Sequence, residues 1–123
     1  MVTKERWCII LRTKPTRYYS KKQENAVAKQ VGGKRTANSG ATTFQKGDVT
    51  SEDWLIECKT SETAKASFSI KREWLEKNKK EAFDTGKMYN ALCFDFGNGS
   101  NRYYIINEKI FKEVMEILQQ SSL

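Results

Sequence analysis

The chain of 123 residues falls in the size range of a single domain, so we expect one domain over residues 1–123. With 38% hydrophobic and 30% charged residues, the composition is that of an ordinary soluble protein, and no run approaches the ~20 apolar residues of a membrane span. The net charge of +7, from 22 Lys and Arg against 15 Asp and Glu, favours an anionic partner, with nucleic acid as the leading candidate.

The apolar run near the N-terminus is short. Its four residues, 8–11, are fewer than the roughly 7–15 of a secretory signal, so we expect an intracellular, cytoplasmic protein, in a host cytoplasm if a phage encodes it. The three cysteines form no C-x-x-C pair, and the chain has no histidine. We therefore expect reduced, buried cysteines and no structural zinc site.

The first half of the chain predicts a strand, a helix and a hairpin. Residues 6–11 are typical of a short strand or buried segment. Ser20 with Gln23 resembles a capping box, and Gly32 with Gly33 ends a helix, which predicts a helix over residues 21–31. After a polar loop, strands are expected at 43–49 and 54–59, joined by the turn-prone residues 50–53.

The second half predicts two helices around a strand pair. Ser69 is expected to cap a helix over about 70–83, and strands are expected at 89–96 and 102–106 around a glycine-containing turn. Asn107 then caps a final helix with one apolar stripe: Ile110, Phe111, Val114, Ile117 and Leu118. The order is roughly β-α-β-β-α-β-β-α, which predicts an α/β fold with a mixed central sheet flanked by helices.

The hairpin carries acids and a lysine among apolar residues. Side chains alternate along a strand, so Glu57 and Lys59 point to the same face. A turn centred on Ser51 and Glu52 would place Asp48 opposite Leu55 and diagonal to Glu57. The helix at 21–31 adds Glu24, which lies on its apolar stripe and faces inward.

Carboxylates held close together repel each other, which raises their pKa values unless a cation lies among them. Oxygen ligands without sulfur or imidazole favour Mg²⁺ or Mn²⁺. Lys59 beside such an ion can orient or help deprotonate an attacking water. The pattern therefore predicts metal-assisted hydrolysis of a phosphodiester.

Asp48, followed nine residues later by Glu57-Cys58-Lys59, resembles the core of the PD-(D/E)XK nuclease superfamily. The segment 20–62, with its loop at 38–41, is most similar to archaeal and phage Holliday-junction resolvases. Gly47 stands where the superfamily name has proline.

The resemblance implies a restriction-endonuclease-like core and a role for each site residue. Asp48, Glu57 and the Cys58 backbone carbonyl would bind the metal. Lys59 would serve the water, and Glu24 would complete the site. Ser39 and Gly40 would lie near the scissile phosphate.

Basic residues around this motif are candidates for contacts with DNA phosphates, although each of them is equally explained as a solvated surface residue. They are Lys34, Arg35, Lys46, Lys65, Lys71 and Arg72. Trp54 and Trp74 are placed in the core. Asp95, on the strand at 89–96, could face the same site, but we favour its interpretation as an exposed acid at the strand end. A junction-cutting enzyme would act as a homodimer, with the apolar final helix as a candidate interface, but burial in the chain's own core explains that helix equally well.

Three functional hypotheses follow. The first is an Mg²⁺-dependent, structure-selective DNA endonuclease, a Holliday-junction resolvase acting on four-way junctions. The second is another nuclease of the same superfamily, such as a nickase, a restriction-like enzyme or a repair enzyme. The third is a basic nucleic-acid-binding module without catalytic activity.

Overall fold

The computed structural model describes residues 16–36, 48–61, 63–97 and 100–121. The predicted strand at 6–11 and most of the predicted strand at 43–49 lie outside these residues. Three of the residues proposed to contact DNA, Ser39, Gly40 and Lys46, also lie outside them.

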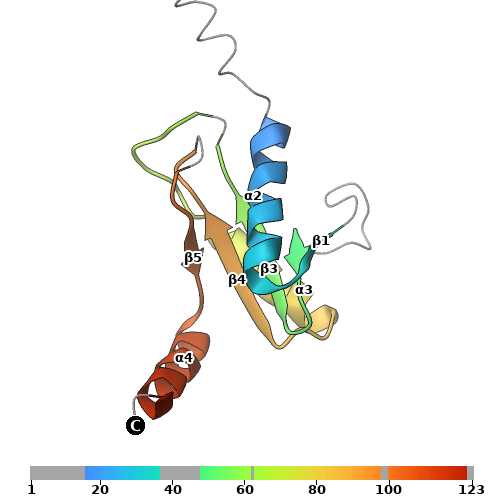
Figure 1. Ribbon diagram of the computed structural model, residues 1–123, viewed down its shortest axis with the longest axis vertical. Helices are drawn as coiled ribbons and strands as arrows, with labels where there is room; N and C mark the ends of the chain where they lie inside the picture. The colour runs from blue at the N-terminus through green and yellow to red at the C-terminus, as the bar shows by residue number, and fades with distance from the viewer. Residues whose placement is uncertain (1–15, 37–47, 62, 98–99, 122–123) are drawn as a thin grey trace, which may run out of the picture.

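The described residues form three helices and five strands (Figure 1). In chain order these are α2 (Thr16–Val31), β1 (Lys34–Arg35), β2 (Val49–Thr50), β3 (Trp54–Lys59), α3 (Arg72–Asp84), β4 (Tyr89–Phe94), β5 (Tyr103–Ile105) and α4 (Glu108–Ser121). Strand β1 falls in the segment that was expected to be a polar loop. No helix in the described ranges combines the length and apolar character needed to cross a bilayer.

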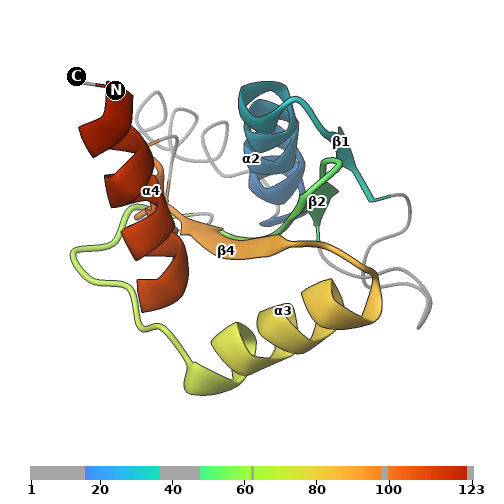
Figure 2. The ribbon, with the colours of Figure 1, turned by 90° about the horizontal axis from the view of Figure 1, so that it is seen from below.

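The five strands form one mixed sheet in the order β1-β2-β3-β4-β5. Strands β3 and β4 are parallel, and every other neighbouring pair is antiparallel. Helix α2 covers one face of the sheet and α3 the other (Figure 2). The fold is therefore α/β with a mixed sheet flanked by helices, as the order of elements predicted.

Two predicted helix starts are wrong. Helix α2 begins at Thr16, so Ser20 lies inside it and does not cap it. Helix propagation costs less than initiation, so a run of acceptable residues extends the helix past a capping signal. Helix α3 begins at Arg72, and its N-cap residue, Lys71, makes no side-chain cap hydrogen bond, so Ser69 is not the cap. The predicted ends are confirmed: Gly32 has φ +67° after α2, and Gly86 has φ +72° after α3.

The hairpin between β2 and β3 forms, but its register differs from the prediction. Leu55 pairs with Thr50 and Ile56 with Val49, so Leu55 is not opposite Asp48. Ser51 explains the shift, because its backbone N–H donates to the Trp54 carbonyl at 3.0 Å and its hydroxyl accepts from the Trp54 N–H at 3.2 Å. This turn centres the hairpin one residue later, and the Asp48 N–H donates to the Ile56 carbonyl.

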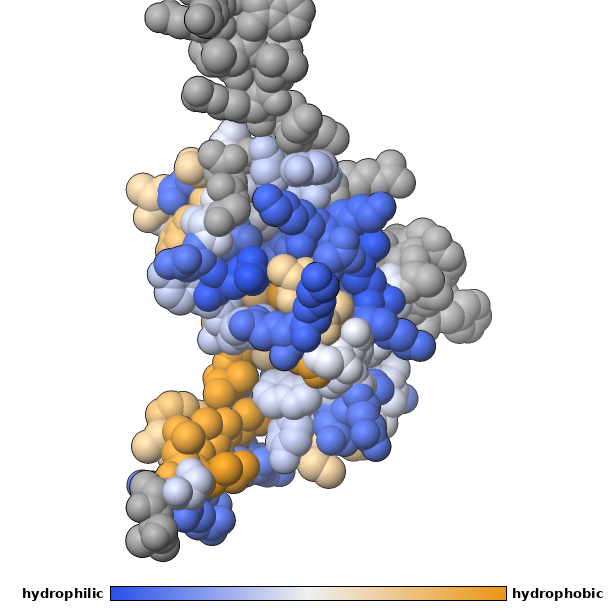
Figure 3. Space-filling view, viewed as in Figure 1, coloured by the Kyte–Doolittle hydropathy of each residue, from blue (hydrophilic) through white to orange (hydrophobic). Residues whose placement is uncertain are grey.

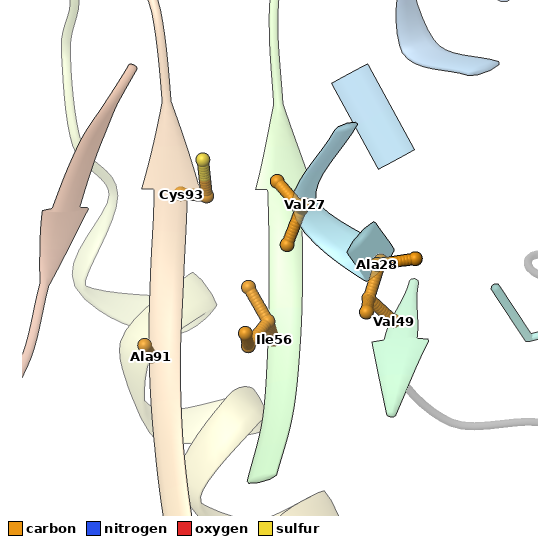
Figure 4. Close-up of a cluster of buried hydrophobic side chains, with 6 residues drawn as sticks. All are labelled: Val27, Ala28, Val49, Ile56, Ala91 and Cys93. Carbon is orange, nitrogen blue, oxygen red and sulfur yellow. The ribbon is translucent and has the colours of Figure 1, made fainter. Parts of the chain in front are cut away.

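Alternation along β3 and β4 separates two packed layers. Figure 4 shows the cluster between α2 and the sheet, formed by Val27, Ala28, Val49, Ile56, Ala91 and Cys93. Leu55 and Leu92 are buried on the α3 face. Trp54 packs half-buried against the cluster, whereas Trp74 is half-buried on α3 and is not one of its members, which corrects its placement in the core.

Helix α4 extends beyond the sheet (Figures 1 and 2). The Asn107 side chain accepts from the Ile110 N–H at 2.8 Å, which confirms the predicted cap. Of the apolar stripe only Ile110 is buried, while Ile117 and Leu118 are 63% and 57% exposed. Figure 3 shows this helix as the main apolar surface of the visible face. Burial in the chain's own core therefore does not account for the stripe.

Candidate active site

The predicted site residues meet where β2 begins beside β3 and α2 crosses the sheet. Asp48 precedes β2, Glu57 and Lys59 lie in the second half of β3, and Glu24 comes from α2. Beyond this point β3 pairs with β4 alone among the described strands.

Backbone and side-chain hydrogen bonds hold Asp48 in place. Its N–H donates to the Ile56 carbonyl at 3.1 Å, and its carbonyl accepts from the Thr36 N–H at 3.0 Å. Its carboxylate Oδ2 accepts from the Cys58 N–H at 2.7 Å. The Asp48 carboxylate is thus the hydrogen-bond acceptor for the Cys58 N–H, in the middle of the Glu-Cys-Lys motif.

Glu57 and Lys59 share the α3 face of β3, as alternation predicted. Lys59 Nζ lies 3.4 Å from Glu57 Oε1 and 4.5 Å from the centre of the Trp74 ring. The carboxylate and the aromatic face both attract the ammonium group. Trp74 therefore helps to fix the lysine.

Glu24 is buried, with 7% of its surface exposed, and its Oε1 accepts from Arg35 Nε at 3.0 Å. This contact assigns Arg35, proposed from the sequence to contact DNA, to an ion pair within the site. Glu24 is thus part of the site, as expected from its place on the apolar stripe of the helix.

Asp48 links the other two acids electrostatically. Burial raises the pKa of Glu57, the charge of Asp48 raises it further, and Lys59 opposes both effects. Burial also raises the pKa of Glu24, where the hydrogen bond from Arg35 acts against it and the Asp48 charge adds to it. Asp48 therefore lies within electrostatic reach of both Glu24 and Glu57, with Arg35 beside Glu24 and Lys59 beside Glu57.

A second polar cluster adjoins the site and was missed from the sequence. Asp95 is 5% exposed, not an exposed strand-end acid as expected, and accepts from the Thr60 hydroxyl at 2.5 Å and the Gly97 N–H at 2.8 Å. Gln23 Nε2 donates to the Lys59 carbonyl at 2.8 Å and to Asp95 at 3.3 Å. The available signal was that Asp95 lies near the end of the strand expected at 89–96, as Thr60 follows the strand expected at 54–59.

The two described cysteines, Cys58 and Cys93, are free and face each other across the parallel strands. The hydrogen bond with Cys93 and burial raise the pKa of the Cys58 thiol, so Cys58 keeps its proton. This agrees with the expectation of reduced cysteines packed as small hydrophobes. Cys8 lies outside the described residues.

The remaining basic candidates lie at the surface. Lys34 is exposed on β1, and Lys65 and Lys71 are exposed around a hollow beside the end of β3. Arg72 donates to Glu76 at 2.8 Å on the exposed face of α3.

Within the described ranges, no three Asp, Glu, Cys or His side chains are arranged as a ready-made metal site. The three acids each have a protein partner instead: Arg35 for Glu24, the Cys58 N–H for Asp48 and Lys59 for Glu57. Comparison of the chain with models of protein families, with curated proteins and with solved structures finds no match.

Proposed function

We propose that the protein is an Mg²⁺-dependent DNA endonuclease with a restriction-endonuclease-like core and that it acts as a Holliday-junction resolvase. One observation carries the proposal: where β2 begins beside β3, Asp48 lies within electrostatic reach of Glu57 and of Glu24, and Lys59 lies beside Glu57. A surface ion-pair network would leave its acids in water, whereas Glu24 is buried and burial raises the pKa of both Glu24 and Glu57.

The donor set fits Mg²⁺ or Mn²⁺. Burial raises the pKa values of Glu24 and Glu57 and the charge of Asp48 adds to both shifts, which a bound cation would offset, and all three side chains offer hard oxygen atoms. Asp48, Glu57 and the Cys58 carbonyl would hold the ion, with Glu24 completing the site. Two protein carboxylates are the usual number for Mg²⁺, which keeps waters and substrate oxygens as its other ligands. The bound ion would supply a water of lowered pKa.

Lys59 serves the water and the developing charge. Glu57 and the Trp74 ring hold its ammonium group at the site, where it orients the attacking water. In the reaction, the water oxygen bonds to phosphorus, the bond from phosphorus to the leaving oxygen breaks, and the leaving oxygen takes up a proton. The ammonium group stabilises the negative charge that grows on the phosphoryl oxygens.

Cutting a junction in two symmetric strands requires two active sites, which a two-fold dimer provides. The exposed apolar face of α4, formed by Phe111, Val114, Ile117 and Leu118, supports a second copy of this chain as the partner. Monomeric proteins rarely leave such a continuous apolar face in water.

The experiment offers the purified protein a four-way junction, a flap, a linear duplex and a single strand, each with Mg²⁺ or with EDTA. Paired symmetric nicks in the junction alone support a resolvase, whereas cutting of ordinary duplex indicates another nuclease of the superfamily. Salt-dependent binding without cutting under Mg²⁺ or Mn²⁺ would overturn the catalytic proposal and leave a binding module.

Two variants test the site assignment. Lys59→Ala removes the ammonium group and should abolish Mg²⁺-dependent cleavage while DNA binding is largely kept. Lys79→Ala, which removes an exposed lysine of α3, is the matched control and should cut at the wild-type rate. Wild-type cleavage by Lys59→Ala would show that the site is elsewhere.

A further inference from the structure

A hollow of about 750 Å³ lies beside the end of β3, on the α3 side. Five hydroxyl side chains line it, namely Thr60, Ser61, Thr63, Ser67 and Ser69, together with Lys65 and Lys71. The Thr60 hydroxyl donates to Asp95, so the other four hydroxyls are the donors that a ligand would meet. No carboxylate is among its described lining residues; Glu62 lies outside them. A hollow of hydroxyl donors and ammonium groups matches the chemistry of phosphate oxygens.

The hollow begins at the candidate active site. Trp74 forms part of its wall, and the same ring lies under Lys59 Nζ at 4.5 Å. Thr60, the residue after Lys59, forms another part of the wall. A strand that places one phosphate at Lys59 can therefore continue directly into the hollow.

The segment that forms the hollow is anchored to the sheet. Lys65 N–H donates to the Phe96 carbonyl at 2.8 Å, and the Phe68 ring stacks on Phe94 with a centroid separation of 5.3 Å. Gly97 approaches so closely that a Cβ there would lie 2.2 Å from the Thr63 carbonyl oxygen. These contacts hold the hydroxyl and ammonium groups in place before a ligand arrives, which lowers the entropy lost on binding.

The aromatic side chains that line the hollow leave little open ring surface on which a base could stack. Trp74 carries Lys59 and Lys71 at 4.5 and 5.7 Å from its ring centre, and one face of Phe68 is stacked on Phe94. Base-stacking platforms in nucleic-acid-binding proteins need an open aromatic face. The hollow is therefore suited to the backbone and not to the bases.

We propose that this hollow binds the phosphodiester backbone of the DNA strand next to the scissile phosphate, without regard to sequence. The inference rests on the proposed function for the identity of the ligand. It adds the path of the strand and the groups that hold it.

The test is a double variant, Lys65→Ala with Lys71→Ala, against the matched control Lys79→Ala with Lys80→Ala, which removes the same charge from the exposed far end of α3. Binding is measured by fluorescence anisotropy, without metal, to labelled junctions of two unrelated sequences over a series of salt concentrations. Circular dichroism verifies that both variants are folded.

The hollow variant should bind at least about tenfold more weakly than the control at low salt, equally for both sequences. Its slope of log affinity against log salt should fall by roughly 2.8–3.6, as expected for two lost phosphate contacts in each chain of the proposed dimer. Equal affinity and slope in the two variants would overturn the assignment of the hollow, and so would a loss confined to one sequence.

Cleavage by the wild-type protein separates this inference from the proposed function. A wild type that cuts while the hollow variant binds like the control would refute the hollow and leave the nuclease. If the wild type never cuts DNA, and only the hollow variant binds it more weakly, the result would support the hollow as a binding site and refute the nuclease.

Discussion

Single residues at this site serve both the fold and the proposed chemistry. Asp48 is the clearest case, because its carboxylate accepts the Cys58 N–H while its charge raises the pKa of Glu24 and Glu57. The hydrogen bond stabilises β3, and the charge works against the burial of two neighbouring acids. The two effects can be separated by a substitution that keeps the acceptor.

Asp48→Asn keeps an oxygen that can accept from Cys58 and removes the charge. We expect cleavage to be lost, and the melting temperature of the metal-free variant at pH 7.5 to equal or exceed that of the wild type. Groups whose folded pKa is raised above the ordinary value bind more protons when folded, so their contribution to stability grows as pH falls through the folded pKa. The excess stability of Asp48→Asn should therefore shrink between pH 7.5 and 5. A variant that is clearly less stable at every pH would contradict the repulsion.

Bound Mg²⁺ should offset the effect of the Asp48 charge on Glu24 and Glu57. Saturating Mg²⁺ is expected to raise the melting temperature of the wild type at pH 7.5 by linkage and to do so less at pH 5, where protons compete for Glu24 and Glu57. Asp48→Asn should show little Mg²⁺ response at either pH. Differential scanning calorimetry measures both proteins at both pH values, with and without Mg²⁺. An equal Mg²⁺ response in both proteins would place the ion elsewhere.

The Asp95 carboxylate accepts hydrogen bonds from the segments that follow β3 and β4 and from α2. Asp95→Ala leaves the Thr60 hydroxyl, the Gly97 N–H and one contact of Gln23 without their acceptor. Each buried unsatisfied group costs about 1–3 kcal/mol, so we expect a loss of at least about 2 kcal/mol in the free energy of unfolding by urea. Asp95→Asn should lose less, because one oxygen remains. Asp53→Ala, at an exposed turn residue, is the control and should change stability by less than about 0.5 kcal/mol.

At the scale of elements, the site depends on how the segments that follow the strands pack against one another. The segment after β3 packs on the turn after β4, where Gly97 has φ +96° and lies against the Thr63 carbonyl. The turn after α3 contains Gly86 with φ +72° and open space around it. Both glycines have a positive φ, but only Gly97 is in close contact with another segment, at the Thr63 carbonyl.

Gly97→Ala and Gly86→Ala therefore form a matched pair. Gly86→Ala should cost roughly 1–2 kcal/mol from the positive φ alone. Gly97→Ala should cost about 1–3 kcal/mol more, because its Cβ would meet the Thr63 oxygen at 2.2 Å and displace the wall of the hollow. Urea unfolding measures both, and equal losses would show that the contact does not constrain the segment.

At the scale of the whole molecule, charge and apolar surface are segregated. The visible face carries hydrophilic residues over α2 and the sheet, and apolar residues over α4 (Figure 3). A cleft of about 660 Å³ lies between α3 and α4, lined by Leu75, Met88, Ile105 and Ile110 among others. The apolar surface at this end of the molecule supports the dimer contact that we propose.

Ile117→Lys tests the proposed dimer. Ile117 is 63% exposed, so the substitution should leave the fold intact. By light scattering after gel filtration, the wild type should have twice the 14.2 kDa of one chain and the variant the mass of one chain. Glu116→Gln changes the net charge by the same amount on the opposite side of α4, away from the apolar stripe, and should stay dimeric. A monomeric wild type, or a variant that stays dimeric, would contradict α4 as the interface.

The sequence by itself determined the α/β class, the β2–β3 hairpin and the Asn107 cap, because periodicity, turn residues and caps act between neighbours along the chain. It also placed Glu57 and Lys59 on one face, since alternation is a local property of a strand. Only the tertiary structure decided that Asp95 is buried, because its partners Thr60 and Gln23 lie 35 and 72 residues away. The same holds for the Arg35–Glu24 pair and for the exposure of the α4 stripe, since ion pairing and burial depend on which distant elements pack against a residue.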